Sequence, residues 1–366
     1  MDSTLAHRYT VVMDVTPKDT SVAAEAWKLW DAKAKPQLSL GRLEQIVVDI
    51  VCMRRQLLPD LGRPLLLLFA ADHGIVAEGV SSSPQEITWQ QCENFAQGGG
   101  AIGLLCMLNG VDLKVVDVGV AHDFRADLPI VDRKIAFGTQ NFAKTAAMTH
   151  SQRHAAMQSG VQMVKMAHAE GRSVIAFGEM GIGNTSSSSA IMSCLTGYDI
   201  DRCTGKGAGL AASALEHKKD VLAKAIAFHG HPTGPMEVLR TFGGFEIAAI
   251  AGGMLEAARL HMVMLVDGFI ASTAALVAIS VEANARDYMV FCHESGEGGH
   301  PALLGYLEVE PLLSLRMRLG EGTGAVVGWS IVHQAVQLYL HMTSFSCAHV
   351  TDSVTLLKKQ GVDFHG

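Results

Sequence analysis

Five short, mainly apolar runs occur between residues 65 and 292, and each ends in a polar or glycine-containing loop. They are LLLLFAA (65–71), KVVDVGV (114–120), VIAF (174–177), MVMLV (262–266) and YMVFC (288–292). Helical patterns such as 152–169 and 243–260 lie between them. Non-alternating apolar runs are typical of strands buried on both faces, and intervening helices indicate a parallel sheet. The pattern therefore predicts an α/β fold with helices on both faces of the sheet.

The loops that follow these runs carry most of the polar side chains of interest. In open parallel sheets, ligands bind outside the carboxyl ends of the strands. We therefore expect all five loops to lie on one side of the molecule. They are Asp72-His73-Gly74, Ala121-His122-Asp123, GEMGIGNTSSSS (178–189), Asp267-Gly268-Phe269 and His293-Glu294-Ser295.

The stretch 178–189 has the composition of an anion-binding loop. It follows a predicted strand and leads into 190–195, a small-residue segment that can continue as a helix. Backbone N–H groups of a glycine-rich loop and a helix N-terminus suit phosphate. Glu179 would repel a phosphate unless its carboxylate points at sugar hydroxyls or a developing cation. The loop therefore indicates a phosphorylated sugar.

The two ends of the chain have a different pattern. Residues 40–57 predict an amphipathic helix whose apolar face belongs to a core or to a dimer surface. Trp27 and Trp30 lie in a short helical pattern before it, 322–342 predicts another helix, and 343–366 reads as a small terminal cap.

Charge and composition narrow the class of protein. The 366 residues carry 29 Lys and Arg against 36 Asp and Glu, a net charge of −7, and no basic run stands out. Nucleic acid is therefore a poor candidate partner. Mean hydropathy is +0.23, but the best candidate span, 247–266, contains Glu256, Arg259 and His261, so we expect no membrane helix. No signal peptide is visible and the seven cysteines are scattered, which indicates reduced thiols in the cytoplasm.

Glu321 is the candidate general base. It stands between glycines in RLGEGTGA (318–325), at the start of a predicted helix, where backbone can approach a ligand closely. In an apolar pocket, burial would raise its pKa towards working pH. The alternative is an acid that stabilises the helix N-terminus.

Other polar groups have two interpretations each. Asp267 follows a strand and either binds sugar hydroxyls or caps the helix that begins near Phe269. Asp72 and His73 form a proton shuttle or part of a metal site, or hold a turn, although one His beside one Asp lacks further metal ligands. Lys218 is a candidate cation in the irregular segment 198–235.

Neutral polar groups supply the remaining candidates. Ser83 and Gln91 suit recognition of a flat heterocycle, or are ordinary surface residues. Ser295 and Glu297 lie in HESGEGGH, a weak motif by itself. No serine-nucleophile elbow and no G-x-x-x-x-G-K-[ST] phosphate loop occurs in the chain.

Five motifs together resemble the nicotinate-nucleotide:dimethylbenzimidazole phosphoribosyltransferases, the CobT family. They are ADHGIVAEGVSSSPQEIT (71–88), GEMGIGNT (178–185), FGGFEIA (242–248), VDGFI (266–270) and RLGEGTGA (318–325), in the family's order. The resemblance covers about residues 35–340.

The resemblance implies transfer of 5-phosphoribose from nicotinate mononucleotide to 5,6-dimethylbenzimidazole or a related base. It implies a homodimer that uses no metal for the chemistry, and we expect no cofactor. The fold it implies is a Rossmann-like parallel sheet, with a large catalytic domain over 60–335. A smaller, mostly helical domain would combine 1–59 with 336–366.

The same resemblance assigns roles to individual residues. Glu321 would remove the azole proton, and Glu179 would face the ribosyl site. Ser83 and Gln91 would border the base pocket. The other substrate-binding positions carried over from the motifs are Gly181, Ile182, Gly183, Asn184, Thr185, Lys218 on the phosphate side, Asp267, Gly320 and Ser295, the last contributed across the dimer.

Departures from the family pattern leave alternatives open. Leu38 stands where the family has glycine, four serines follow Thr185, and 295–297 reads S-G-E. Some relatives act as pairs of unlike subunits on phenolic bases, so the native base stays open. A non-catalytic nucleotide-binding paralogue is a further alternative. An enzyme that uses phosphoribosyl pyrophosphate would need an acidic pair before a phosphate loop, and none occurs.

Overall fold

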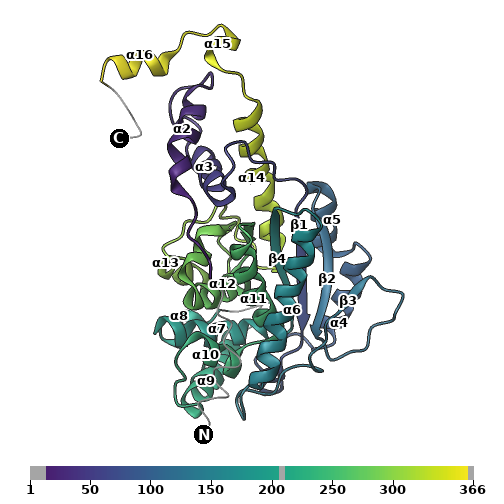
Figure 1. Ribbon diagram of the computed structural model, residues 1–366. Helices are drawn as coiled ribbons and strands as arrows, with labels where there is room; N and C mark the ends of the chain where they lie inside the picture. Colours follow the sequence, from purple (N-terminus) through teal and green to yellow (C-terminus); the bar gives the residue numbers. More distant parts are fainter. Residues whose placement is uncertain (1–13, 206–210, 362–366) are drawn as a thin grey trace.

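A single six-stranded sheet forms the centre of the computed structural model, which describes residues 14–205 and 211–361 (Figure 1). All of its strand pairs are parallel, and the strand order is β3-β2-β1-β4-β5-β6. The strands are β1 (Leu65–Ala71), β2 (Asp112–Gly119), β3 (Ile130–Asp132), β4 (Val174–Met180), β5 (Val263–Val266) and β6 (Met289–Phe291). The α/β fold predicted from the apolar runs is confirmed.

Every residue of β1, β4 and β5 is buried, as the non-alternating apolar runs predict. Two details differ from the prediction. The edge strand β3 was missed, because two half-buried residues and the exposed Asp132 make no apolar run. Strand β4 does not end at Phe177, since its pairing with β1 continues through Glu179 and Met180. Glu179 is therefore a strand residue rather than part of the loop.

Helices cover both faces of the sheet. They are α2 (Ala23–Asp31), α3 (Arg42–Arg54), α4 (Ile87–Ala96), α5 (Gly100–Asn109), α6 (His150–Ala169), α7 (Asn184–Thr196), α8 (Ile200–Cys203), α9 (Ala212–Phe228), α10 (Pro235–Phe242), α11 (Phe245–Arg259), α12 (Phe269–Val281), α13 (His300–Tyr306), α14 (Thr323–His341), α15 (Phe345–Ala348) and α16 (Ser353–Lys359), with short 3-10 turns at Thr20–Val22, Gly74–Glu78 and Ala283–Tyr288. In the described ranges, none of these helices is long and apolar enough to cross a bilayer.

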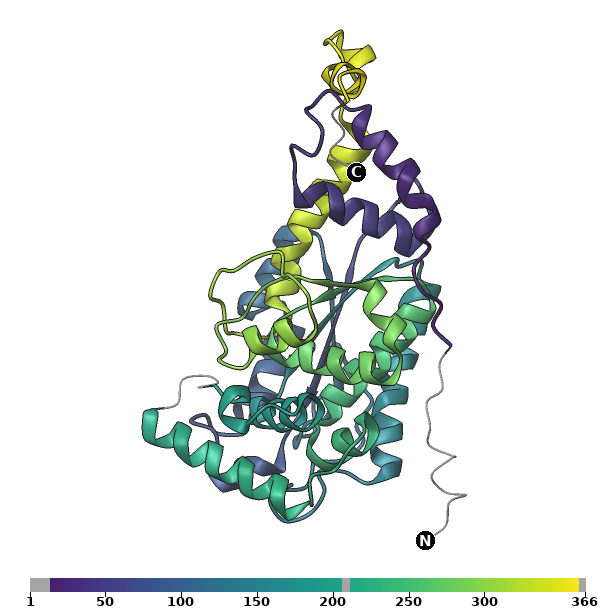
Figure 2. The same cartoon turned by 90° about the vertical axis from the view of Figure 1, so that its left-hand side faces the viewer.

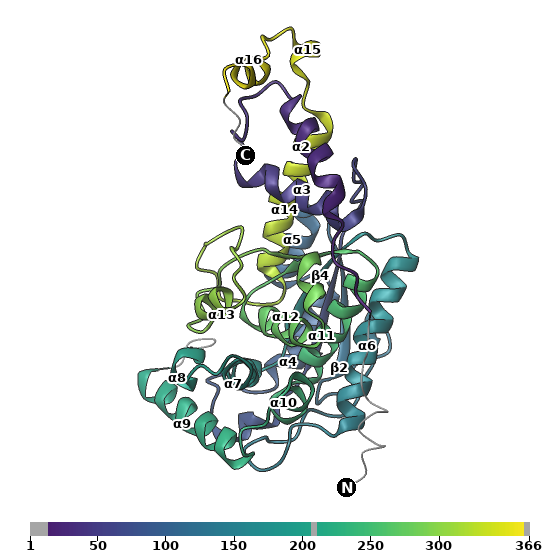
Figure 3. The ribbon, with the colours of Figure 1, turned by 60° about the vertical axis from the view of Figure 1, so that its left-hand side comes forward.

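Helices α6, α11 and α12 lie in connections that run along the sheet towards β6, whereas α4 and α5 lie in the connection from β1 to β2, which runs the other way. Because such connections are right-handed, the two groups of helices cover opposite faces of the sheet. Figure 3 shows α11 beside α12, with α14 next to α5. Helix α11 packs closely on α6 because glycines meet backbone there. A Cβ atom on Gly160 would lie 1.8 Å from the carbonyl oxygen of Ala249. The core therefore excludes side chains at this crossing.

The two chain ends meet in a helical unit beyond one end of the sheet, as expected (Figure 2). Helix α3 packs on α14, the rings of Trp30 and Tyr339 lie 5.1 Å apart, and the amide of Phe345 donates to the carbonyl of Ala32 at 3.1 Å. The domain limits at 59/60 and 335/336 stay a prediction. Helix α14 runs through the second limit without a break.

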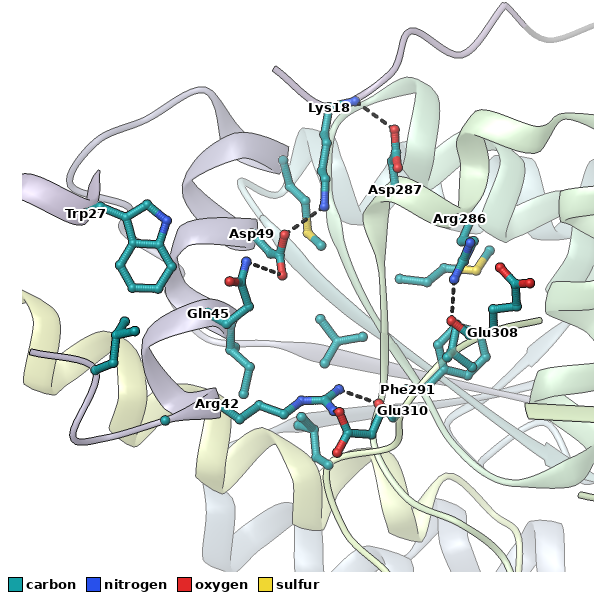
Figure 4. Close-up of a pocket in the computed structure, with 18 residues that line it drawn as sticks. Lys18, Trp27, Arg42, Gln45, Asp49, Arg286, Asp287, Phe291, Glu308 and Glu310 are labelled. Carbon is teal, nitrogen blue, oxygen red and sulfur yellow. Dashed lines mark hydrogen bonds and ion pairs between the residues drawn. The ribbon is translucent and has the colours of Figure 1, made fainter. Parts of the chain in front are cut away.

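A large cleft of about 970 Å³ lies between α3, β6 and the segment 308–312, and we call it the α3 cleft. Figure 4 shows charged side chains bridging it. Lys18 pairs with Asp49 at 2.7 Å, and Arg42 pairs with Glu310. The guanidinium of Arg286 donates to a backbone carbonyl at 2.6 Å. The cations of this cleft are thus already engaged.

Candidate active site

A second, smaller pocket of about 240 Å³ lies at the carboxyl ends of β4, β5 and β6, and we call it the strand-end pocket. Segments from across the chain line it, and twelve of the thirteen predicted site residues are among them. These are Ser83, Gln91, Glu179, Gly181, Ile182, Gly183, Asn184, Thr185, Asp267, Ser295, Gly320 and Glu321. The thirteenth, Lys218, donates from its ammonium to the hydroxyl of Thr185 at 2.8 Å.

The predicted order of strand, glycines and helix start is present, but the loop is shorter than 178–189, because β4 includes 178–180 and α7 begins six residues before Ala190. Strand β4 ends at Met180, Gly183 has φ +96°, and α7 begins at Asn184 with no side chain bound to its N-terminus. A side chain at Gly183 would be strained by that φ and would place its Cβ 2.7 Å from a methyl of Val76. Burial lowers the pKa of Lys218 to about 8. Helix N–H groups and an ammonium together suit a phosphate dianion.

Three consecutive residues before α14 adopt left-handed backbone conformations. Gly320, Glu321 and Gly322 have φ values of +79°, +65° and +85°. Glu321 is the only one with a side chain, and a left-handed conformation costs such a residue roughly 1–2 kcal/mol. Strain of this kind persists only where the surroundings hold it. Neighbouring groups must therefore stabilise the backbone conformation in which this turn holds Glu321.

Two glycines allow that turn to lie against β4. A Cβ atom on Gly178 would lie 2.6 Å from the carbonyl oxygen of Glu321. One on Gly320 would lie 2.3 Å from a carboxyl oxygen of Glu179. The backbone of the turn thus packs directly on the strand, which brings the two predicted carboxyl groups into one pocket.

Asp267 binds the backbone on the other side of the turn. Its Oδ1 accepts hydrogen bonds from the amides of Gly324 at 2.6 Å and Ala325 at 3.2 Å, and its Oδ2 accepts from Gly322 at 3.1 Å. The alternative that Asp267 caps the helix beginning at Phe269 is wrong, since α12 has no side-chain cap. Asp267 instead caps α14, which begins 56 residues later in the chain. A role in binding sugar hydroxyls stays a prediction.

The carboxyl of Glu321 has the properties of a base. The residue is 6% exposed, and among the described residues its Oε2 has no hydrogen-bond partner. Burial, with a smaller contribution from the charge of Asp267, raises the pKa of Glu321 to about 7. Glu321 precedes the N-cap of α14, Gly322, and no hydrogen bond joins its side chain to that helix end. A base with this pKa is half ionised near neutral pH.

Glu179 is engaged by its surroundings. One carboxyl oxygen accepts from the side-chain amide of Asn184, and the other from the backbone amide of Glu321 at 3.4 Å. Burial, followed by the charges of Asp267 and Glu246, raises the pKa of Glu179 well above its usual range. The pocket therefore favours the protonated form, which stabilises a ribosyl cation less than a carboxylate would.

The predicted base-recognition residues come from the segment after β1 and from α4. Ser83 and Gln91 line the pocket with Ile87, which supplies an apolar surface between polar groups. Ser295 lies in the pocket of its own chain, whereas the resemblance implies that it arrives across a dimer. The amide of Ser295 donates to Nδ1 of His300 at 2.8 Å. Burial lowers the pKa of His300 to about 3, so this ring is neutral.

The sequence did not identify the partners of His73. Its ring nitrogens lie 2.6 Å from a carboxyl oxygen of Glu246 and 2.9 Å from the hydroxyl of Ser187. Over the described ranges, no group of three His, Cys, Asp or Glu side chains is arranged to hold a metal ion. His73 contacts the phosphate loop, since a Cβ on Gly181 would lie 3.2 Å from its ring. His73 therefore packs against the phosphate loop.

Comparison with known proteins gives consistent matches. A family model described as "Phosphoribosyltransferase" matches residues 15–350. A nicotinate-nucleotide–dimethylbenzimidazole phosphoribosyltransferase of Dechloromonas aromatica is 46% identical over 88% of this chain and 93% of its own. One from Bacteroides fragilis is 41% identical over 87% and 92%. The crystal structure of CobT from Thermus thermophilus superposes with a TM-score of 0.86 at 37% identity, covering 90% of this chain and 99% of that one.

Proposed function

We propose that this chain, which belongs to the nicotinate-nucleotide–dimethylbenzimidazole phosphoribosyltransferase family, transfers 5-phosphoribose from nicotinate mononucleotide to 5,6-dimethylbenzimidazole. The products are α-ribazole 5′-phosphate and nicotinate. The observation that carries the proposal is the buried carboxyl of Glu321, which has a pKa of about 7 and an oxygen with no hydrogen-bond partner in the described part of the chain. It shares its pocket with the N-terminus of α7, which no side chain of the described residues caps.

Glu321 acts on the acceptor base. An azole nitrogen forms a bond to C1′ of the ribose while the bond from C1′ to the nicotinate ring nitrogen breaks, and its electron pair stays on nicotinate. The other azole N–H becomes acidic as attack proceeds, and Oε2 of Glu321 takes that proton. Because the proton is transferred only during attack, the carboxylate stabilises the transition state more than the bound substrates.

The remaining residues hold the donor and the base. The N-terminus of α7 and the ammonium of Lys218 would bind the 5′-phosphate, and the hydrogen bond from Lys218 to Thr185 in that first turn supports this role. Ser83 and Gln91, which line the same pocket with Ile87, would offer hydrogen bonds to the acceptor base. Holding both substrates in line converts a bimolecular reaction into a step within one complex.

A transfer assay tests the proposed function. The purified chain is incubated with nicotinate mononucleotide and dimethylbenzimidazole, and nicotinate release is followed by chromatography. A parallel panel of benzimidazoles, purines and phenols identifies the native acceptor. We expect nicotinate release with an azole. Release only with phenols would mean that the acceptor is a phenol rather than dimethylbenzimidazole. No release with any base would contradict the proposed function.

We also propose that the active form is a homodimer, which the family resemblance supports. Light scattering during size-exclusion chromatography gives the mass in solution. A single 39.0 kDa species that is fully active would contradict the dimer. Activity that appears only after a second, unlike subunit is added would replace the homodimer with a two-subunit form.

A further inference from the structure

Asp267 has no carboxyl oxygen that is free of the protein backbone. The residue is 2% exposed, and its two oxygens together accept three backbone amides from residues 322–325. A ring nitrogen of His293 lies 3.4 Å from Oδ1 on the same side. Because the carboxylate of Asp267 already accepts these hydrogen bonds from the protein, it has little remaining capacity to accept one from a sugar hydroxyl.

The backbone that Asp267 binds is the strained turn that carries Glu321. Gly320, Glu321 and Gly322 are all left-handed, and the three bound amides begin within this turn and continue into the first turn of α14. No side chain of the turn itself caps α14. The carboxylate of Asp267, which is distant in the sequence, therefore takes the place of a local N-cap of α14 and opposes relaxation of the turn.

The backbone that Asp267 binds is closely packed. A Cβ on Gly324, in the first turn of α14, would lie 1.9 Å from the ring of His293. A Cβ on Gly178 of β4 would lie 2.6 Å from the carbonyl oxygen of Glu321, in the turn itself. Asp267 adds hydrogen bonds to this packed backbone.

We propose that Asp267 is a positioning residue, which clamps the left-handed turn 320–322 to the start of α14 and thereby holds the Glu321 carboxyl towards the acceptor base, and which does not bind the ribosyl donor. The inference rests on the proposed function for its catalytic consequence. It gives Asp267 a role different from the sugar-binding role that the position of the residue after a strand suggests.

The clamp also has an electrostatic consequence that separates the two roles. The negative charge of Asp267 raises the pKa of Glu321, after burial itself. Removal of that charge moves the pKa of Glu321 down. The other charged or titratable side chains that line the pocket around Glu321 are Glu179, His293, Glu297 and Arg318, and the substitution replaces none of them. Removal of the Asp267 charge also moves the pKa of Glu179 down, since that charge helps to raise it.

The experiment compares Asp267→Asn with Asp117→Asn. Asp117 is a matched control, because it is also 2% exposed, accepts two backbone amides at the end of β2, and pairs with Lys134, but does not line the pocket. For Asp267→Asn we expect kcat to fall about 100-fold, as a misplaced catalytic group does. KM for nicotinate mononucleotide should stay within about threefold. The acid limb of kcat should move to lower pH, while Asp117→Asn leaves kcat and that limb unchanged.

Three results would overturn the inference. A large rise in KM for nicotinate mononucleotide, with kcat and its acid limb unchanged, would make Asp267 a ligand of the donor. Unchanged kinetics would remove any role. If kcat fell equally in Asp267→Asn and Asp117→Asn and the acid limb did not move, the loss would reflect general destabilisation of the protein.

Hydrogen exchange provides a readout that needs no turnover. In Asp267→Asn, amides of 320–326 should exchange faster than in the wild type, whereas those of β1 should not change. Asp267→Ser, which keeps one acceptor for a helix amide without the charge, serves if the asparagine variant does not fold. Unchanged exchange in the variant that folds contradicts the clamp. Because exchange is independent of nicotinate release, an inactive wild type would contradict the proposed function and leave this test in place.

Discussion

The α3 cleft and the strand-end pocket differ in how their charges are compensated. The α3 cleft is about 970 Å³ and the strand-end pocket about 240 Å³, yet the larger one carries cations that are already bonded within the protein. In the smaller pocket, the carboxyl of Glu321 is buried and has an oxygen without a partner among the described residues. A buried, uncompensated group costs stability, and its retention indicates chemistry rather than architecture. Volume alone would have selected the α3 cleft, whose cations are already engaged.

The backbone differs between the two regions as well. One side of the α3 cleft is a regular helix and another is a regular edge strand. The strand-end pocket is bordered by a glycine-rich helix start and by a turn with three left-handed residues. Such backbone costs free energy, and other groups must offset it. The comparison predicts that substitutions in the pocket change turnover, whereas equivalent ones in the cleft do not.

The largest expected effect is on turnover in Glu321→Gln. Loss of a positioned base should reduce kcat by about 10²–10⁴-fold, which corresponds to roughly 3–5 kcal/mol. Glu310→Gln in the α3 cleft is the matched control, because Glu310 is exposed and pairs with Arg42. Nicotinate release measures both. Equal losses of kcat in the two variants would contradict the distinction between the strand-end pocket and the α3 cleft.

The next effect is on stability, and it has the opposite sign to the effect on activity. Glu321 has a folded pKa of about 7, above the value of about 4.3 for an unfolded chain. Its protonated form therefore stabilises the fold fully below about pH 4.3, and this contribution is lost as pH rises through about 7. Glu321→Gln should thus be more stable than the wild type at pH 8, by roughly 3.5 kcal/mol.

Urea unfolding of the wild type and of Glu321→Gln at pH 8 and pH 5 measures this difference. Glu310→Gln again serves as control and should show no comparable gain. A glutamine variant that is less stable than the wild type at pH 8 would mean that the carboxyl is compensated in the folded protein.

A smaller effect is expected at Lys218. Removal of a charge-assisted hydrogen bond costs about 1.5–3 kcal/mol, so Lys218→Met should raise KM for nicotinate mononucleotide by about 10–150-fold, with a smaller change in kcat. Lys219→Met is the control, since Lys219 pairs with Asp201 and Glu216 instead of Thr185. Steady-state kinetics with varied nucleotide measures both variants. An unchanged KM in Lys218→Met would remove the ammonium from the phosphate site.

Much of the fold was predictable because its strands are buried on both faces. The run 65–71 matches β1 residue for residue, and the predicted helix 322–342 matches α14 within one residue at each end. Strand β3 was not predictable, since its half-exposed residues depend on pairing with β2. The extent of β4 through Met180 also depends on a neighbour, β1, rather than on local sequence.

The site was predictable as a set of residues and less so as a set of contacts. All thirteen predicted residues come together, because the carboxyl ends of parallel strands share one edge. The contacts of Asp267 with Gly322 and Gly324, and of His73 with Glu246, join segments 55 to 173 residues apart. No local pattern encodes such pairs, so these two roles required the structure.

The pH dependence of kcat tests most directly whether Glu321 is the base in the strand-end pocket. Nicotinate release by the wild type is measured at saturating nicotinate mononucleotide and dimethylbenzimidazole between pH 6 and pH 9. The structure predicts that kcat rises with pH to a plateau, with a midpoint at about 7, and that this limb is absent from the residual activity of Glu321→Gln. A wild-type profile that is flat through pH 7, or a limb that persists in the glutamine variant, would contradict the assignment.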